Sequence, residues 1–157
     1  MDEPQSLAEK LAQEGEKIFQ FFQTLREADW SLPVYTEGET WTVRDLLAHL
    51  VTSEKGLLRL FEQIRQGAPG VPPDFSIDRY NAEQQQKTRH LTPAELLEQY
   101  RTTRANTVAW VRQCTPADLE RRGRHPFLGE TTLREMLKMI YLHNQLHLRD
   151  ARKALRT

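Results

Sequence analysis

The feature that most constrains the fold is a long helical apolar stripe near the C-terminus, from Met136 to Ala154. At about 100° per residue, positions three and four apart share one face of a helix. That face carries Met136, Met139, Ile140, His143, His147, Asp150 and Ala154. Two imidazoles therefore lie on the side that the helix should bury. An i, i+4 pair has Cβ atoms about 5–6 Å apart, so both rings could bind one ion; two buried, hydrogen-bonded histidines are the alternative interpretation.

Length and charge limit the class of protein. A chain of 157 residues suits one domain over residues 1–157 that is stable without disulfides, and Cys114 is its single cysteine. Lys and Arg total 22, as do Asp and Glu, so no net positive field favours nucleic acid. Residues 1–15 carry charges where a signal peptide needs an apolar run, and no segment is apolar enough to span a membrane. We expect a cytoplasmic protein without membrane or nucleic-acid partners.

Four amphipathic stretches predict an all-α fold, a four-helix bundle. They cover residues 6–29, 42–66, 93–113 and about 132–154. Thr92 and Glu95 form a predicted capping box, and Thr131 or Thr132 caps the last helix, with Glu135 in capping-box register to Thr132. Residues 30–39 and 121–129 are predicted loops. The long crossover 67–92 between the second and third helices contains a polar, partly helical segment, residues 76–90, that could act as a lid. Its length allows the two helices to run parallel, and the pattern alone leaves the topology open.

The second helix carries two polar side chains at or near its buried face. His49 lies at the edge of that face, and Glu54 falls among its leucines. A boundary histidine bonded to a carbonyl is the simpler interpretation of His49. For Glu54 the simpler interpretations are a carboxylate that reaches solvent or one paired with a core-facing arginine.

Two sequence segments carry a resemblance to a known family. The segments Trp41–Leu50 (WTVRDLLAHL) and His143–His147 (HNQLH) resemble the DinB/YfiT-like superfamily of helical-bundle metalloproteins, and the segments 78–81 and 127–133 also look familial. The likeness covers essentially the whole chain. It implies that His49, His143 and His147 bind a divalent ion, commonly zinc or nickel.

The resemblance does not select one reaction. The superfamily includes bacillithiol S-transferases and the mycothiol-dependent maleylpyruvate isomerase domain, whose relatives often have an acid at the position of His143 and a further C-terminal domain. The segment Trp41–Leu50 and the loop around Asn81 are also similar to the ClbS/DfsB branch, which includes a self-resistance cyclopropane hydrolase and does not rely on all three histidines. Both departures leave the subfamily open.

Three neutral imidazoles leave a divalent ion with its full charge and an open coordination position, as in catalytic sites. Such an ion can activate water or a thiol. Since Cys114 has no histidine in register, a thiol would have to come from a low-molecular-weight cosubstrate. Asp150 and Glu54 are candidate acceptors for the second N–H of a ligating histidine, and Glu54 could instead be the general base.

Three residues on the long connections are candidates for substrate contact: Tyr80, Asn81 and His125. Three functions follow as alternatives. The chain could be a thiol-dependent S-transferase or isomerase acting on a small molecule, a metal-assisted hydrolase, or a non-catalytic small-molecule-binding or resistance bundle with structural histidines. A homodimer would fit if Trp30 and Trp110 stay exposed.

Overall fold

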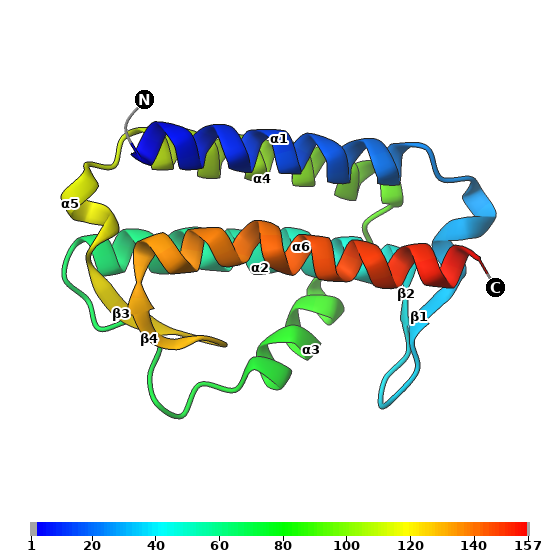
Figure 1. The fold of residues 1–157 in the computed structure, drawn as a ribbon. Helices are drawn as coiled ribbons and strands as arrows, with labels where there is room; N and C mark the ends of the chain where they lie inside the picture. Colours follow the sequence, from blue (N-terminus) through cyan, green and yellow to red (C-terminus); the bar gives the residue numbers. More distant parts are fainter. Residues whose placement is uncertain (1–2, 157) are drawn as a thin grey trace.

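The computed structural model describes residues 3–156 and is mostly helical (Figure 1). Its helices are α1 (Glu3–Gln23), α2 (Val43–Arg65), α3 (Ile77–Thr88), α4 (Pro93–Arg112), α5 (Pro116–Leu119) and α6 (Leu133–Leu155), with a 3₁₀ turn at Glu27–Ser31. The four long helices α1, α2, α4 and α6 form the bundle, so the predicted four-helix bundle is confirmed. No helix within residues 3–156 is both long and apolar enough to cross a membrane.

Capping boxes set where the bundle helices begin. In α2 the Thr42 hydroxyl accepts the backbone N–H of Asp45, whose carboxylate accepts the backbone N–H of Thr42. Thr92 and Glu95 make the same exchange at the start of α4. At the start of α6 only half of the predicted box is present: the Thr132 hydroxyl accepts the backbone N–H of Glu135. Each box satisfies backbone donors that the first helical turn leaves without partners. This local chemistry explains why the predicted starts of α2, α4 and α6 agree with the structure.

The bundle has two layers, with α1 beside α4 and α2 beside α6 (Figure 1). Helix α1 also contacts α6, and α2 contacts α4. Because the crossover carries the chain back along the bundle, α2 and α4 run in the same direction (Figure 1). The topology that the sequence left open is therefore not a simple up-and-down arrangement.

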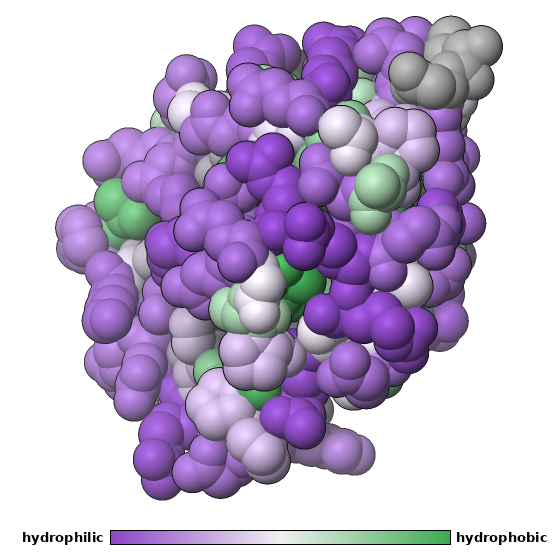
Figure 2. All heavy atoms as spheres, turned by 90° about the vertical axis from the view of Figure 1, so that its left-hand side faces the viewer, coloured by the Kyte–Doolittle hydropathy of each residue, from purple (hydrophilic) through white to green (hydrophobic). Residues whose placement is uncertain are grey.

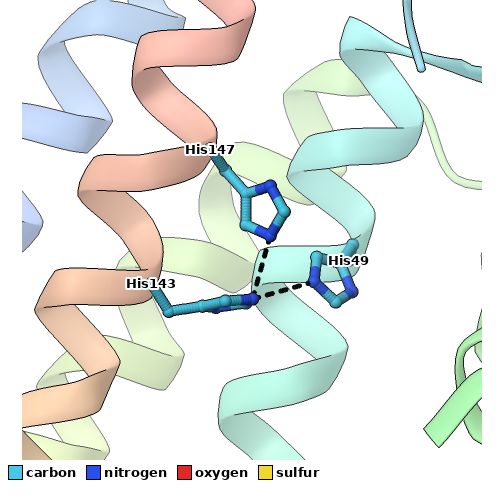
Figure 3. Close-up of side chains that lie close together, drawn as sticks. All are labelled: His49, His143 and His147. Atoms are coloured by element: carbon cyan, nitrogen blue, oxygen red, sulfur yellow. Dashed lines mark hydrogen bonds between the residues drawn. The ribbon is translucent and has the colours of Figure 1, made fainter.

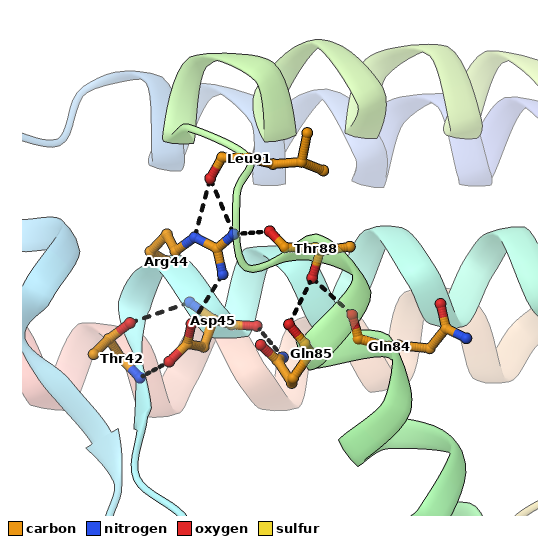
Figure 4. A network of polar contacts seen from close by, with 7 residues as sticks. All are labelled: Thr42, Arg44, Asp45, Gln84, Gln85, Thr88 and Leu91. Atoms are coloured by element: carbon orange, nitrogen blue, oxygen red, sulfur yellow. Dashed lines mark hydrogen bonds and ion pairs between the residues drawn. The ribbon is translucent and has the colours of Figure 1, made fainter.

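The crossover helix α3 is attached to α2 mainly by polar contacts (Figure 4). The Gln85 side chain donates to the backbone oxygen of Asp45 at 2.8 Å. The Arg44 guanidinium donates to the backbone oxygens of Thr88 and Leu91. The only buried residues of α3 are Gln85 and Thr88, both polar. The expected helical crossover is thus found on the outside of the bundle, without an apolar stripe.

Two β-hairpins occupy segments predicted to be loops. They are formed by β1 (Pro33–Tyr35) with β2 (Trp41–Thr42), and by β3 (Arg122–His125) with β4 (Gly129–Thr132). Strands this short carry almost no alternating apolar pattern, which is why the loop predictions were wrong here. Both hairpins and α3 lie on the same side of the α2–α6 layer (Figure 1).

The apolar core is divided into two clusters along the bundle. One contains Leu11, Leu60, Phe61, Val108, Val111 and Ile140 among others, and the second contains Ile18, Phe22, Leu50, Val51, Tyr100 and Leu148 among others. Between the two, each of α2, α4 and α6 contributes a buried polar residue: Glu54, Arg104 and Asn144. We call these three residues the polar layer.

The surface is largely hydrophilic, as the end of the bundle with α5 and the β3–β4 hairpin shows (Figure 2). Among the described residues, the exposed large apolar side chains are Phe127, Leu128, Leu142 and Leu146. The expectation that Trp30 and Trp110 stay exposed is not met, because both are partly buried. Trp30 stacks on Phe22, and the Trp110 indole donates to Glu62 at 3.3 Å.

Candidate metal centre

Three histidines meet between α2 and α6. His49 projects from the second turn of α2, and His143 and His147 project from α6 one turn apart, with their rings turned toward one another (Figure 3). The Nε2 atom of His143 lies 3.2 Å from Nε2 of His49 and 2.9 Å from Nε2 of His147. The ring centroids are separated by 5.0, 5.0 and 4.4 Å. The convergence of these three side chains, predicted from spacing and resemblance, is present in the fold.

The spacing of the nitrogens fits a single metal ion. Nitrogen ligands about 2.0–2.1 Å from one zinc ion, at angles of roughly 90–110°, lie about 2.9–3.4 Å apart. The two short Nε2–Nε2 distances fall within that range, and one ligand atom of each histidine lies within 4.8 Å of the others. Geometry and donor type therefore both suit a divalent ion.

Burial keeps the three imidazoles neutral. It is the main cause that lowers the pKa of each ring, and the pKa of His147 is lowered to about 3 by burial together with the nearby His143. The neighbouring histidines lower the pKa values of His49 and His147 further. Near pH 7 the cluster thus offers uncharged nitrogens, the form that binds metal.

A tyrosine and a carboxylate orient His147. The Tyr35 hydroxyl lies 2.8 Å from Nδ1 of His147 and donates to Oδ2 of Asp150 at 2.5 Å. Burial opposes ionisation of Asp150, but hydrogen bonds from Tyr35 and Arg149 lower its pKa, so the carboxylate can only accept. The tyrosine proton therefore points to Asp150, and the tyrosine oxygen accepts Nδ1–H of His147. This tautomer leaves the Nε2 lone pair of His147 directed at the centre.

Sequence reasoning did not identify Tyr35 as a neighbour of the histidine cluster. Asp150 was expected to accept a proton from His147 directly, whereas the structure places the Tyr35 hydroxyl between them. Tyr35 lies on β1, within a segment predicted to be a loop, and 112 residues separate it from His147. No local sequence signal joins the two.

His49 is supported by its own helix and by the first hairpin. The Ser53 hydroxyl lies 3.2 Å from Nδ1 of His49, so Nε2 faces the other two rings. Trp41 of β2 packs over His49 with 5.0 Å between ring centroids. The β1–β2 hairpin therefore supplies contacts to two of the three histidines, through Trp41 and Tyr35.

Glu54 is bound within the polar layer. Its two oxygens accept hydrogen bonds from Nε and Nη2 of Arg104 at 2.9 and 2.8 Å, and the Thr107 hydroxyl donates at 2.8 Å. Both side chains of this ion pair are about 95 % buried. The alternative of a core-facing arginine partner is confirmed. The general-base role stays a prediction, and this geometry gives it no support because both oxygens already have partners.

Arg104 extends this network across the bundle. It donates to the backbone oxygen of Leu11 in α1 at 2.9 Å and to Oδ1 of Asn144 in α6 at 3.1 Å. The Tyr100 hydroxyl donates to the same Asn144 oxygen at 2.7 Å. Gly15 makes room for the guanidinium, since a Cβ there would lie 2.7 Å from the arginine side chain. All four bundle helices are thus joined at one level.

A family model described as the DinB superfamily matches residues 10–151. The chain belongs to the DinB superfamily. The family identification made from the two histidine segments is thereby confirmed. No curated protein sequence matches the chain significantly.

Solved structures share the DinB fold. YfiT from Bacillus subtilis, described as a probable metal-dependent hydrolase with an unusual four-helix bundle topology, is 20 % identical with a TM-score of 0.79, covering 98 % of this chain and 86 % of YfiT. Mycothiol-dependent maleylpyruvate isomerase is 16 % identical with a TM-score of 0.76; 96 % of this chain matches 61 % of the isomerase. The colibactin self-resistance protein ClbS, solved with double-stranded DNA, is 14 % identical with a TM-score of 0.68, covering 95 % of this chain and 94 % of ClbS. At these identities the likeness establishes the fold.

The DinB bundle places the expected substrate-contact residues on α3 and on the second hairpin. On α3, the Tyr80 hydroxyl donates to the backbone oxygen of Thr52, one turn beyond His49, and Asn81 is partly buried. Within residues 3–156 neither side chain hydrogen-bonds to the three histidines. His125 ends β3 and is buried, with 5 % of its surface exposed. The contact of these residues with a substrate stays a prediction.

Proposed function

We propose that this DinB-superfamily chain is a divalent-metal-dependent enzyme that acts on a small molecule, as a thiol-dependent S-transferase or isomerase. The observation that carries the proposal is the convergence of three neutral Nε2 atoms, of His49, His143 and His147, at separations that suit one ion. A bound zinc or nickel ion would supply a Lewis acid with an open coordination position, able to lower the pKa of a thiol or of water.

The chain's own residues prepare this site. Tyr35 and Asp150 fix the tautomer and direction of the His147 ring. Ser53 holds the direction of the His49 ring through Nδ1, and Trp41 packs against that ring. For Glu54 we propose a structural role in place of a base, because Arg104 and Thr107 occupy its oxygens. Its charge also opposes the lowering of the His143 pKa.

The reacting thiol would come from a cosubstrate. Cys114 is buried, and burial raises its pKa to about 11, so it remains a protonated thiol near pH 7. The structurally similar maleylpyruvate isomerase is mycothiol-dependent, which favours thiol chemistry. The similarity to YfiT, a probable metal-dependent hydrolase, favours the second candidate, a metal-assisted hydrolase.

Metal analysis tests the ion-binding part of the proposal. We expect the purified chain to bind about one zinc or nickel ion, measured by elemental analysis and by isothermal titration, and His143→Ala to abolish stoichiometric binding. The matched control is His90→Ala, since His90 is exposed and lies outside the cluster. Absence of stoichiometric binding by the wild-type chain, or unchanged binding by His143→Ala, would contradict the proposal.

A reaction screen separates the candidate activities. The zinc-loaded chain and His49→Ala are incubated with a panel of electrophiles and a low-molecular-weight thiol, and conjugation is followed by mass spectrometry. We expect conjugation or isomerisation that needs both the thiol and His49. Ester or amide cleavage without thiol would support the hydrolase, and conjugation that survives loss of His49 would exclude the ion as the catalyst.

We also propose that the protein acts in the cytoplasm, that its partners are small molecules, and that it does not bind nucleic acid. The balanced charge, with 22 basic against 22 acidic residues, supports the absence of a nucleic-acid partner. ClbS was solved with DNA, so the point needs its own measurement. Fluorescence anisotropy with a labelled duplex should show no binding at physiological salt, and saturable binding would contradict the proposal.

A further inference from the structure

The turn between β3 and β4 holds His125 in one tautomer. Its Nδ1 atom accepts the backbone N–H groups of Phe127 and Leu128, each at 3.0 Å. A nitrogen that accepts two N–H groups has no proton of its own, so the proton of the neutral ring is on Nε2. Burial, with a further contribution from His143, lowers the pKa of His125 to about 4. The ring therefore stays a neutral Nε2–H donor at physiological pH.

This donor has no partner. Among the buried side-chain nitrogen and oxygen atoms of residues 3–156, Nε2 of His125 alone lacks a hydrogen bond. A buried donor without an acceptor costs about 1–3 kcal/mol, so native structures rarely keep one without a reason. Nδ1 of the same ring, by comparison, accepts two hydrogen bonds from the backbone of the turn. The hairpin thus satisfies one ring nitrogen of His125, whereas the other has no partner among the described residues.

His125 lies on the side of the bundle that carries the histidine cluster's other neighbours. The β3–β4 hairpin packs against α6, which carries His143 and His147, and His143 is close enough to affect the pKa of His125. The β1–β2 hairpin, which contacts His49 and His147, lies on the same side of the α2–α6 layer (Figure 1). The two hairpins therefore approach the cluster's side of the bundle from its two ends.

We propose that the Nε2–H group of His125 binds an acceptor oxygen of the substrate, so that substrates of the histidine centre carry a carbonyl or carboxylate group. The inference rests on the proposed function and adds the substrate class to it. A neutral imidazole suits this task, because it can polarise a carbonyl oxygen without giving up its proton. The two backbone N–H groups at Nδ1 hold it in that form.

Two variants separate the two nitrogens of His125. His125→Asn can keep an acceptor for the turn but loses the Nε2 donor, whereas His125→Gln keeps a donor near Nε2 but loses the turn acceptor. The probes are acetohydroxamate, an oxygen ligand with a carbonyl group, and ethanethiol, which has no acceptor oxygen. Both are titrated calorimetrically into the zinc-loaded chain, and circular dichroism checks the fold of each variant.

We expect His125→Asn to weaken acetohydroxamate binding about tenfold, as for one lost hydrogen bond, and to leave ethanethiol binding within about twofold. His125→Gln should bind acetohydroxamate closer to wild type. Equal weakening of both probes, or none, would overturn the inference. If the wild-type chain takes up no zinc, the proposed function fails and this inference with it; normal zinc binding with an unchanged Asn variant overturns this inference alone.

A measurement on the metal-free wild-type chain is independent of variant folding. With ¹⁵N-labelled histidine, NMR should find His125 protonated at Nε2 and not at Nδ1 near pH 7. In the zinc-loaded chain, the Nε2–H signal should move when acetohydroxamate is added and stay in place with ethanethiol. A proton on Nδ1, or a signal that moves equally with both probes, would contradict the assignment.

Discussion

Two polar clusters lie side by side in this bundle, and they differ in whether a charged protein group binds the acceptors that meet there. In the polar layer, the Glu54 oxygens, the Arg104 guanidinium and the Asn144 oxygen all have partners. In the histidine cluster, adjacent along α6, Nε2 atoms of neutral rings face one another across 2.9 and 3.2 Å. In the polar layer the Arg104 cation binds the Glu54 carboxylate, whereas among residues 3–156 the histidine cluster brings together ring nitrogens with no protein cation between them.

The polar layer has the features of a structural cluster, and the histidine cluster has those of a binding site. A buried polar network that satisfies all its members fixes one arrangement of the helices. A cluster whose acceptors converge on one point has a geometry that a positive ion would complete. Burial and polarity alone would not have told the two apart; the partners of each atom do.

Breaking the polar layer should have the largest effect on stability. Glu54→Ala leaves Arg104 buried without its charge partner and should lower the free energy of unfolding by about 3–5 kcal/mol, measured by urea denaturation. The control is Glu62→Ala, whose partner Arg65 is partly exposed, with an expected loss below about 1 kcal/mol. Similar losses for both variants would remove the distinction between the layer and a surface pair.

Zinc should stabilise the chain only through the histidine cluster. At a free zinc concentration about 100 times Kd, the free energy of unfolding should rise by about 2.7 kcal/mol. The gain should vanish in His147→Ala, measured by denaturation with and without zinc. The variant Asn144→Asp, altered in the adjacent polar layer, should start from a lower stability and keep the gain. A zinc effect that survives in His147→Ala would place the ion elsewhere.

Removing one hydroxyl should weaken metal binding without touching a ligand. Tyr35→Phe frees Nδ1 of His147 and separates it from Asp150, so zinc affinity should fall about 10- to 100-fold in a chelator competition assay. Tyr141→Phe, a partly buried tyrosine of the same helix as His147, should leave affinity unchanged. Equal affinities for wild type and Tyr35→Phe would show that the ring of His147 needs no support from the hairpin.

Acid should destabilise the metal-free chain through its buried histidines. Their folded pKa values lie below the usual 6.5, at about 4 for His125 and about 3 for His147, so the unfolded chain binds more protons as pH falls. Stability should be full above about pH 6.5 and decrease toward pH 4, by up to about 1.4 kcal/mol per pH unit for each histidine. Urea denaturation from pH 7.5 to 4.5 should show a shallower loss for His125→Asn. Parallel curves would contradict the assignment.

Local chemistry made the helices predictable. Capping residues such as Thr42 and Thr92 act within one turn, and apolar periodicity repeats along each helix. The three histidines were also accessible, since His143 and His147 are one turn apart and the resemblance supplied His49. The contact between Tyr35 and His147 could not be predicted from the sequence, because it depends on how a short hairpin packs against a helix residue 112 positions later. The partner of Glu54 was foreseen only as a type, an arginine, and the fold alone identifies Arg104.

The parallel course of α2 and α4 has a consequence for how the chain can vary. Helix α2 has 23 residues and is about 34 Å long, so the segment that follows must travel back over most of that distance before α4 begins. Even fully extended, such a return needs about ten residues. Replacing α3 with a tight turn would therefore reverse α4 and change the topology, whereas exchanging its sequence at constant reach would preserve it. The return segment must keep its length, but its amino-acid sequence can vary. Proteins that share this bundle can therefore acquire different surfaces at this position.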